Sequence, residues 1–543
     1  MAASKGGRWG TIGLLAAATF LAFVPALRGD FVYDSRIQVL TDPLLHDAAN
    51  WPAVLSGRVL GMDVLDFNRP AMLASLMLDA AIWEKNPFGY HLTSVLLHAL
   101  NVVLVWLLLD RLLLDRLLLD RLGASAPERG LLPPAVIGAL VFAVHPIVTE
   151  TVCEPSYRED LLVATFTLTA LVIAIAPSRA PANSLDVTAE SANSTAWRVA
   201  ACVGCALLAI ASKESGVVLP PLLLIAWRLF GRNDPRRFWA LAIGGTALVV
   251  MAFLAARFLL EPMESRIFGK PVPLGGSLQA AVAIQPRILA LDAQLILWPF
   301  NQSADYQLSS LDHLPLPRSI LILALLAAAL SWGARHDRRI GFAAALIVLS
   351  VLPVANLWPI FQPAADRYLY LPMVGVATIV ASLLDRPWWP AGLAVSAARR
   401  GAVGVAMATV AVLAVACLRR EAVWHDPVAL WQDTLRKAPY SFTAAWGLGE
   451  ALFDAGRPKE AERIAREAVK LSGGEDGGAW ATLAVIVADQ GRMAEAQSHL
   501  SRALAADPLL SDPDQRVAAL AMERPWAERL KRLLAAKPAA ASP

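Results

Sequence analysis

The chain has 543 residues, of which 57% are hydrophobic and only 17% are charged, and its mean hydropathy is +0.51. This composition lies outside the range of soluble globular proteins and is typical of a polytopic membrane protein. The net charge of +3 gives no basic excess of the kind that nucleic-acid-binding proteins carry, so no nucleic-acid partner is expected. Four cysteines in a chain of this length exclude a disulfide-stabilised scaffold.

Apolar segments long enough to cross a membrane recur along residues 1–420, and this part of the chain is predicted to be a polytopic, all-α membrane domain. A spanning helix needs about 20 apolar residues, and about eleven segments qualify. The segment 284–300 is also apolar, but two prolines, an arginine and an aspartate interrupt it, so it is expected to be interfacial or re-entrant. The predicted spans lie near residues 10–27, 90–109, 132–149, 161–177, 197–212, 215–230, 238–258, 319–333, 340–356, 368–384 and 401–418.

The short loops that are rich in Lys and Arg predict the orientation, because such loops stay in the cytoplasm. For this set of spans they all lie on one side, so the N-terminus is expected in the cytoplasm and the C-terminal tail outside. The first span has no small-x-small cleavage pattern and is expected to be a retained anchor. Residue usage favours a bacterial inner membrane with a periplasmic tail, with an endoplasmic-reticulum membrane and a lumenal tail as the alternative. The basic clusters lie before residue 10 and at 111–129, 228–237, 335–339 and 386–400.

After residue 420 the composition changes to polar, amphipathic helices, so 421–543 is predicted to be a separate extracytoplasmic domain. Trp446 and Trp480 recur at a period of about 34 residues, with Gly456 and Gly491 in register. Each repeat reads as a helix, a glycine-containing turn and a second helix. This pattern resembles the tetratricopeptide repeat (TPR), which predicts an α-helical solenoid that holds a peptide or partner protein. The alternative is a purely structural cap that leans on the membrane domain.

Four polar groupings emerge on the outer face in this topology. Ionisable groups at membrane depth are costly and indicate a functional site by default. The first grouping is FVYDSRIQVLTDPLL at 31–45, followed by FNRP at 67–70 and GYHLTSVLLH at 89–98; the others are HPIVTETVCEPSYRED at 145–160, SKES at 212–215 and QPAADRYLYLP at 362–372.

Each candidate in these groupings also has a structural alternative. What favours a site is that all of them lie on one face of the membrane, which none of the structural alternatives requires. In those alternatives Asp34 caps a loop helix, His145 ends a helix, Glu150 pairs with Arg158, Lys213 and Glu214 neutralise each other, and Arg367 snorkels to lipid headgroups.

The ordered set FVYDS, NRP, GYHLTSVLLHALN, HPIVTE…YRED, SKESGVVLP and DRYLYLP, followed by TPR repeats, resembles the transmembrane and TPR-repeat-containing family over nearly the whole chain. That family is similar to the polyprenyl-phosphate-sugar-dependent glycosyltransferases with the GT-C membrane fold. The resemblance implies an inverting transfer of mannose or another hexose from a polyprenyl-phosphate donor to an acceptor hydroxyl, on protein, at the outer face. Two positions depart from the family pattern: its first-loop acidic pair is Asp34–Ser35 here, and its Glu before the Arg-Tyr motif is Asp366.

An acceptor hydroxyl needs a base, and the leaving lipid phosphate gains charge that cations stabilise. Asp34 is therefore the expected base. Since its neighbour is a serine, dependence on a divalent metal is left open, and no metal ligand or cofactor is predicted beyond the lipid-linked sugar. Arg158, Lys213 and Arg367 are expected to bind the donor phosphate, with Glu150 orienting Arg158. The residues expected to orient these groups or line the substrate cleft are Arg69, His91, His145, Glu150, Glu214, Tyr368 and Tyr370.

The expected partners of such an enzyme are the lipid-linked sugar, membrane lipids and an acceptor protein or peptide presented by the TPR domain. A non-enzymatic, membrane-anchored TPR scaffold is the main alternative, and it predicts that Asp34 is dispensable. A lipid-linked transporter is a third possibility. It is disfavoured because a transporter needs ionisable groups in the middle of its spans, and these spans are nearly free of charge.

Overall fold

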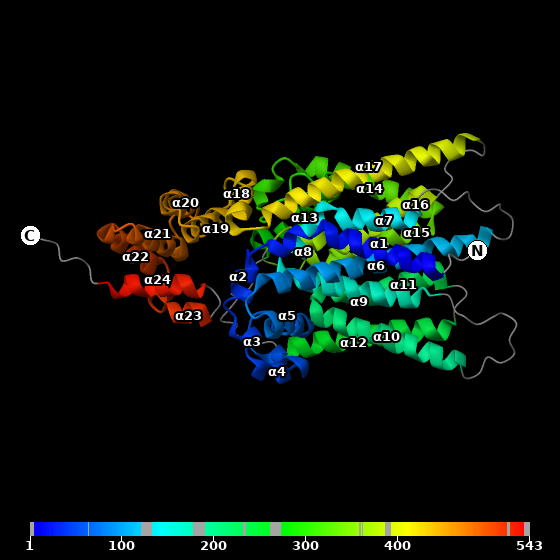
Figure 1. The fold of residues 1–543 in the computed structure, drawn as a ribbon, viewed down its shortest axis with the longest axis horizontal. Coiled ribbons are helices and arrows are strands. Elements are labelled where there is room, and N and C mark those ends of the chain that lie inside the picture. Colours follow the sequence, from blue (N-terminus) through cyan, green and yellow to red (C-terminus); the bar gives the residue numbers. More distant parts are fainter. Residues whose placement is uncertain are drawn as a thin grey trace, which may run out of the picture.

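The regular secondary structure is helical throughout the described residues, with no strand among them, so the predicted all-α class is confirmed. Figure 1 shows an elongated molecule in which a bundle of long helices continues, at one end, into a smaller group of C-terminal helices. The computed structural model describes residues 5–62, 64–120, 133–176, 190–231, 235–260, 273–357, 360, 362–385, 393–518 and 522–536.

The long helices of the bundle run roughly along the long axis of the molecule (Figure 1). The residue before a proline disfavours helical dihedrals, so α7 ends where His145 precedes Pro146. The bundle helices are α1 (Lys5–Ala22), α6 (Pro87–Asp120), α7 (Pro134–Val144), α9 (Arg158–Ala174), α10 (Glu190–Ser212), α11 (Leu219–Phe230), α12 (Arg236–Leu260), α14 (Leu316–His336), α15 (Arg338–Val351), α16 (Pro372–Asp385) and α17 (Leu393–Val423).

The chain is a multi-pass membrane protein by the length and apolarity of these helices. Six of the described helices are long and apolar enough to cross a membrane, and the bent pair Pro134–Val144 and Pro146–Cys153 would make a seventh. Most of the other bundle helices have fewer than 18 residues. The predicted count of about eleven spans therefore stays a prediction. The six are Pro87–Leu113, Ser194–Ser212, Arg236–Leu260, Leu278–Leu297, Leu316–His336 and Arg400–Val423.

The segment 284–300 forms most of one unbroken helix, α13 (Leu278–Leu297), although the sequence suggested an interruption. Its length and apolarity would also allow it to span a membrane. Its polar contacts, however, tie it to loops: Arg287 in its middle donates to backbone carbonyls just before α14. Near its C-terminal end, the carbonyl oxygen of Ile296 lies 3.0 Å from Nε2 of His145.

Most of the predicted polar groupings, and the neighbouring segments 51–55 and 71–83, form helices at or near the ends of the long bundle helices, whereas 89–98 lies within α6. Several of these helices lie at the end of the bundle next to the C-terminal helices (Figure 1). Many of these helices start with proline, whose fixed φ and missing N–H suit a first helical turn. They are α2 (Asp34–Gln38), α3 (Pro43–His46), α4 (Trp51–Leu55), α5 (Pro70–Trp83), η4 (Pro146–Val148), α8 (Thr149–Cys153), η5 (Pro155–Tyr157), η6 (Glu214–Val218) and η11 (Asp366–Leu369).

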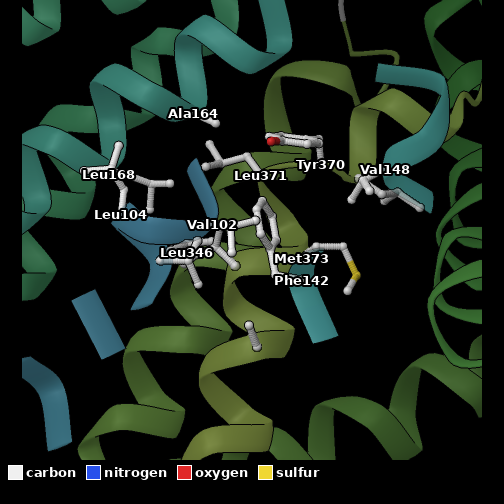
Figure 2. Close-up of a cluster of buried hydrophobic side chains, with 14 of the residues drawn as sticks. Val102, Leu104, Phe142, Val148, Ala164, Leu168, Leu346, Tyr370, Leu371 and Met373 are labelled. Atoms are coloured by element: carbon white, nitrogen blue, oxygen red, sulfur yellow. The ribbon is translucent and has the colours of Figure 1, made fainter. Parts of the chain in front are cut away.

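Apolar side chains of α6, α7, α9, α15 and α16 fill the interior of the bundle. Figure 2 shows a close-up of some of them. Val102 of α6, Phe142 of α7 and Met373 of α16 have no exposed surface. Inside a membrane such contacts stabilise the bundle mainly by van der Waals packing, because lipid is as apolar as the side chains. Tyr370 lies in the same cluster, which bears on its expected role below.

The C-terminal helices form antiparallel pairs, and the predicted TPR-like solenoid is confirmed. Gly456 and Gly491 have φ of 74° and 80° in the turns that join the helices of two pairs, a conformation that favours glycine. Ala461 and Ala496 are fully buried where helices approach closely. The helices are α18 (Pro427–Lys437), α19 (Phe442–Asp454), α20 (Pro458–Leu471), α21 (Gly477–Asp489), α22 (Met493–Ala506), α23 (Pro513–Ala518) and α24 (Arg524–Ala535).

Candidate functional site

Asp34 begins α2, and its side chain is exposed although its neighbours in the chain are more buried. Tyr33, just before it, has a φ of 48°, a strained value for a residue with a side chain that costs about 1–3 kcal/mol. Two contacts hold Tyr33 in place: its ring stacks on Trp431 of α18 with 5.0 Å between centroids, and its hydroxyl accepts a hydrogen bond from Gln362 at 2.6 Å. Contacts from two distant parts of the chain therefore hold the backbone that presents Asp34.

A continuous series of contacts runs from Asp34 to two of the cations that were expected to bind phosphate. The hydroxyl of Tyr157 donates to Oδ2 of Asp34 at 2.9 Å. Cζ of Arg367 lies 4.0 Å from the centroid of the Tyr157 ring and 5.0 Å from that of Tyr368. Nζ of Lys213 lies 5.6 Å from the centroid of the same Tyr368 ring. These are cation–π distances, so the expected base and both cations belong to one cluster.

Both cations also have carboxylate partners. Nη1 of Arg367 lies 2.5 Å from Oε1 of Glu150, and the backbone N–H of Arg367 donates to the other carboxylate oxygen at 3.3 Å. Nζ of Lys213 lies 2.6 Å from Oδ2 of Asp160 and 3.5 Å from Oε1 of Glu159. The charges of both cations are therefore neutralised within the cluster.

Arg69 and Glu214 extend the cluster on the side of Lys213. Arg69 pairs with Glu159 at 3.3 Å and with Glu214 at 3.5 Å, so it is linked to Lys213 through the shared Glu159. Arg69 also pairs with Asp66 at 2.7 Å, and Glu214 is 3.2 Å from Arg257 of α12. Both residues therefore lie in the cluster, within a network of alternating charges.

The surroundings of Asp34 act on the pKa of its carboxyl group in both directions. The surrounding protein raises the pKa of Asp34 above its ordinary value, since it limits solvation of the charged form. The Arg367 guanidinium and the hydrogen bond from Tyr157 act in the opposite direction and lower the same pKa. A general base is most effective when its pKa lies near the working pH, and an upward shift moves a carboxylate towards that range.

A second carboxyl group lies beside the Asp34–Ser35 pair. Ser35 is fully buried at the position of the family's second acid, and its backbone N–H donates to Oε1 of Glu154 at 2.8 Å. Burial raises the pKa of Glu154 to about 8, and the nearby charge of Asp34 adds to the shift. The Glu154 carboxyl group therefore anchors the start of α2 across 119 positions of sequence, and its raised pKa favours the protonated form.

Arg158 does not lie in this cluster. It is fully buried, its Nη1 is 2.6 Å from Oδ2 of Asp79 in α5, and its Nη2 donates to the carbonyl oxygen of Tyr90 at 2.9 Å. The expected phosphate-binding role of Arg158 is therefore corrected to a structural one, because its guanidinium is enclosed and already paired. The expectation that Glu150 orients it is also corrected, since Glu150 pairs with Arg367.

Three more residues expected in the cleft belong to the packed interior instead. His91 is 1% exposed, and its Nε2 lies 3.3 Å from a backbone carbonyl oxygen. His145 is 3% exposed, and its Nε2 lies 3.0 Å from the carbonyl oxygen of Ile296. It therefore fits the structural alternative, in which it only ends a helix. Tyr370 is 1% exposed, lies in the apolar cluster of Figure 2 and has its hydroxyl 2.7 Å from Nδ1 of His98, so it has no surface for a sugar.

Sequence reasoning missed several members of the cluster. Tyr157, Glu159 and Asp160 all lie in the stretch 145–160 that had been singled out, and its density of polar groups was the available signal. Arg257, in the last turn of α12, is a further member, since it pairs with Glu214.

Comparison with known proteins gives matches to both parts of the chain. Residues 452–522 match the Tetratricopeptide repeat family. Protein O-mannosyl-transferase F38B6.6 of Caenorhabditis elegans is 22% identical over 84% of this chain and 62% of its own length. Protein O-mannosyl-transferase TMTC3 of Homo sapiens is 23% identical over 65% of this chain and 40% of its own length, and TMTC1 of Homo sapiens is 23% identical over 85% and 55%.

The chain therefore spans 62% or less of the length of these curated relatives. Among solved structures, the crystal structure of ArnT from Cupriavidus metallidurans bound to undecaprenyl phosphate is 14% identical, with a TM-score of 0.40 over 94% of this chain and 80% of that chain. The relatives confirm the resemblance that the ordered motifs indicated: the chain is similar in sequence to the TMTC proteins over most of its length, and its tail matches the Tetratricopeptide repeat family.

Proposed function

We propose that this protein is an inverting membrane glycosyltransferase that moves mannose or another hexose from a polyprenyl-phosphate donor to a hydroxyl group of an acceptor protein. The observation that carries the proposal is the exposed carboxylate of Asp34, joined through Tyr157 to the Arg367 guanidinium. This pairing of a base with cations suits a reaction that removes a proton from one substrate and releases a phosphate from the other. The similarity to proteins named O-mannosyl-transferases supports the choice of sugar and acceptor.

Asp34 acts as the general base in this proposal. Its carboxylate takes the proton of the acceptor hydroxyl as that oxygen bonds to the anomeric carbon of the sugar. The bond from the anomeric carbon to the phosphate oxygen breaks on the opposite face, so the configuration inverts and the lipid phosphate leaves with the electron pair. Tyr157 donates to Oδ2 alone, which leaves the other oxygen of Asp34 available to the acceptor.

Arg367 and Lys213 bind the donor phosphate in this proposal. Arg158 does not, because its guanidinium is buried and paired with Asp79. Cations aimed at the place where negative charge develops stabilise the transition state most when the site is poor in water. Arg367 is 9% exposed and Lys213 6%, so both would act in such surroundings. Tyr368, half-buried between the two cations, is the aromatic face proposed to contact the sugar.

The only cofactor-like molecule in the proposal is the lipid-linked sugar itself. Among the described residues there is no group of three or more His, Cys, Asp or Glu side chains arranged to hold a metal ion. The Asp34–Ser35 pair leaves open whether the reaction needs a divalent metal. The rate of sugar transfer, measured in EDTA and then after Mg²⁺ or Mn²⁺ is added, decides this. Activity that survives EDTA would support the carboxylate acting without a metal.

The TPR domain is proposed to present the acceptor protein, in a bacterial inner membrane with a cytoplasmic N-terminus and a periplasmic tail. The match of 452–522 to a repeat family that forms binding solenoids supports this role. The basic clusters of the short loops support the orientation. Reporter fusions after α6 and at the C-terminus test it, and a C-terminal reporter active in the cytoplasm would overturn it.

A membrane-anchored TPR scaffold without catalytic activity is the second candidate. The observation in its favour is the internal neutralisation of the site, in which Arg367 and Lys213 each have a carboxylate partner. Charged side chains paired in this way also occur in purely structural networks. The scaffold requires the TPR face for function but not Asp34.

A comparison of glycoproteins in four strains separates the two candidates. One strain lacks the protein, and the others express wild type, Asp34→Asn or Asp47→Asn at equal levels. Asp47→Asn is the matched control because Asp47 caps a helix nearby, a role that Asn fills equally well. Hexose additions on exported proteins that return with wild type and the control, but not with Asp34→Asn, are the expected result. Equal glycosylation with Asp34→Asn, or no change in any strain, would favour the scaffold.

A further inference from the structure

A pocket of about 640 Å³ lies where the last long helix of the bundle meets the TPR domain. Ala411, Val412 and Val415 of α17 form one wall of it. Pro299 and Phe300, just after α13, form another, and residues at the start of the TPR domain in α18 complete it. The pocket therefore joins an apolar helix surface to the first helix of the tail.

The polar part of the pocket carries more cations than carboxylates. Arg419, Arg420, Arg436 and Lys437 line it together with one carboxylate among the described lining residues, Asp433. Asp433 contacts three of these cations: Arg420 at 3.1 Å, Lys437 at 2.6 Å, and Arg436. Positive charge is therefore left over and available to an anion that enters the pocket.

Two buried lining residues have donors without a partner. Nε of Arg420, which is 5% exposed, and Nε2 of Gln302, which is 2% exposed, donate no hydrogen bond to another described residue. Nη2 of Arg420 has only a long ion pair, 3.8 Å from Oδ2 of Asp366. Buried polar groups are nearly always hydrogen-bonded, so unpartnered donors around one pocket indicate that an acceptor-rich group binds there. A phosphate supplies such acceptors, and guanidinium groups match its geometry.

The pocket lies at the level expected for lipid headgroups. The apolar wall belongs to the candidate span Arg400–Val423, and its residues Val412 and Val415 are 55% and 51% exposed, as lipid-facing side chains are. Trp298 and Phe300 beside it are also exposed, at 65% and 48%. Exposed aromatic residues of this kind are typical of the membrane–water interface. The apolar wall thus leads into the hydrocarbon while the cations remain among the headgroups.

We propose that this pocket binds an anionic membrane phospholipid. Its phosphate is held by Arg419, Arg420 and Arg436, and an acyl chain lies along the α17 surface formed by Val412 and Val415. The pocket shares no lining residue with the cluster around the proposed catalytic base, so its occupant is a resident lipid rather than the sugar donor. A lipid bound here contacts both α17 and α18 and stabilises the angle between the membrane domain and the tail.

Native mass spectrometry of the purified full-length protein tests the proposal, with phosphatidylglycerol, phosphatidylcholine and a polyprenyl monophosphate titrated separately. Wild type is expected to bind one phosphatidylglycerol at least about tenfold more tightly than phosphatidylcholine. The double variant Arg419→Gln/Arg436→Gln removes two exposed cations and is expected to abolish that preference. Arg463→Gln/Lys470→Gln removes two exposed cations from α20 and serves as the matched control.

A second variant tests the apolar wall without changing the charge. Val415→Trp fills the pocket from its exposed side and is expected to weaken phosphatidylglycerol binding as well. The proposal is overturned if Arg419→Gln/Arg436→Gln binds phosphatidylglycerol as tightly as its control. It is also overturned if the substitutions weaken binding of the polyprenyl phosphate alone, because the pocket would then hold the sugar carrier.

Discussion

Arg36 and Glu523 form a bidentate ion pair, with Nε of Arg36 2.7 Å from Oε1 and Nη2 2.8 Å from Oε2. Arg36 lies in α2, two residues after Asp34, whereas Glu523 immediately precedes α24 in the TPR domain. Nη2 of Arg36 also donates to Asp454 at 3.0 Å, at the end of α19. The loop that carries the proposed base is therefore attached directly to the tail.

Removing either partner of this ion pair is expected to loosen the tail. Arg36→Gln and Glu523→Gln should each speed proteolytic release of the TPR domain. The double variant should do little more than Arg36→Gln alone, because Arg36→Gln already removes the pair with Glu523 as well as the contact with Asp454. The coupling free energy is expected to be about 1 kcal/mol, as for a well-formed pair near the surface. Fully additive effects of the two substitutions would show that the pair is not formed in solution.

Asp34→Asn is expected to lower the rate of sugar transfer by about 10²–10⁴-fold, which is the usual contribution of a positioned general base. The amide oxygen of Asn still accepts the Tyr157 hydrogen bond, so the fold should be preserved. Transfer from a polyprenyl-phosphate mannose to a hydroxyl-containing peptide measures this, with Asp47→Asn as control. A rate within twofold of wild type would remove Asp34 from the mechanism.

Tyr157→Phe is expected to move the acid limb of the pH–rate profile to higher pH. The Tyr157 hydroxyl donates to the ionised carboxylate and lowers the pKa of Asp34, so its loss raises that pKa. A base must be ionised to act, and activity is therefore lost at a higher pH as the solution is made more acid. The phenyl ring keeps the contact with Arg367, which separates the two effects.

The control for this pH shift is Tyr440→Phe, which removes the hydroxyl of a 78% exposed tyrosine in the tail. Its pH–rate profile should match that of wild type. An unshifted acid limb in Tyr157→Phe would mean that Asp34 is not the group whose ionisation limits transfer.

Asp79→Asn is expected to destabilise the protein by about 3–5 kcal/mol, because it leaves the buried charge of Arg158 without its partner. Asp110→Asn is the matched control, since Asp110 pairs with Arg8 in a more exposed ion pair that is expected to contribute about 0–1 kcal/mol. Thermal unfolding in detergent compares the two. An Asp79→Asn protein with unchanged stability but weaker donor binding would restore Arg158 to the substrate site.

Glu450→Gln is expected to stabilise the TPR domain at pH 8 but not at pH 4. Burial raises the pKa of Glu450 to about 8, and the charge of Glu523 contributes, while Arg36 opposes the shift. Because this pKa is higher in the folded than in the unfolded chain, wild-type stability falls as pH rises from about 4 to about 8. Gln keeps the acceptor for the Thr482 hydroxyl and removes the charge.

The expected gain from Glu450→Gln at pH 8 is about 1–3 kcal/mol, which allows for partial solvent access to the side chain. Thermal unfolding at both pH values measures it, with Glu467→Gln on the exposed face of α20 as control. An equal effect of Glu450→Gln at the two pH values would show that Glu450 does not titrate with folding.

The apolar segments, the TPR period and the gathering of polar groupings were all predictable, because each depends on patterns along the chain. The choice of ion-pair partners was not. Arg158, Glu159 and Asp160 are consecutive on α9, so their side chains point about 100° apart. Arg158 therefore faces Asp79, while the two acids face Lys213. Sequence alone allows either face to turn towards the site, because only the packing of α9 sets its rotation.

Tyr370 illustrates a second limit of sequence reasoning. It lies three positions after Arg367, and both belong to the one polar-aromatic motif that carries part of the family resemblance. Arg367 belongs to η11, whereas α16 begins just after Tyr370. The ring of Tyr370 packs inside the bundle, with its centroid 5.2 Å from that of Phe142. The start of the buried helix α16 therefore separates Arg367, in the candidate site, from Tyr370, in the core. The sequence motif does not indicate where that helix starts.

The contacts of Tyr33 make the tail a structural part of the proposed site. Its ring packs against Trp431 and, at 6.4 Å between centroids, against Trp424, and both tryptophans lie beyond the boundary at residue 420 that composition suggested. A chain truncated at that boundary would lose the two tryptophans that pack against the strained residue Tyr33, next to Asp34. It would therefore lose the geometry of the proposed base as well as the domain proposed to present the acceptor. The tail is thus not an interchangeable module: a chimera with the repeats of a relative would have to keep this tryptophan pair to remain active.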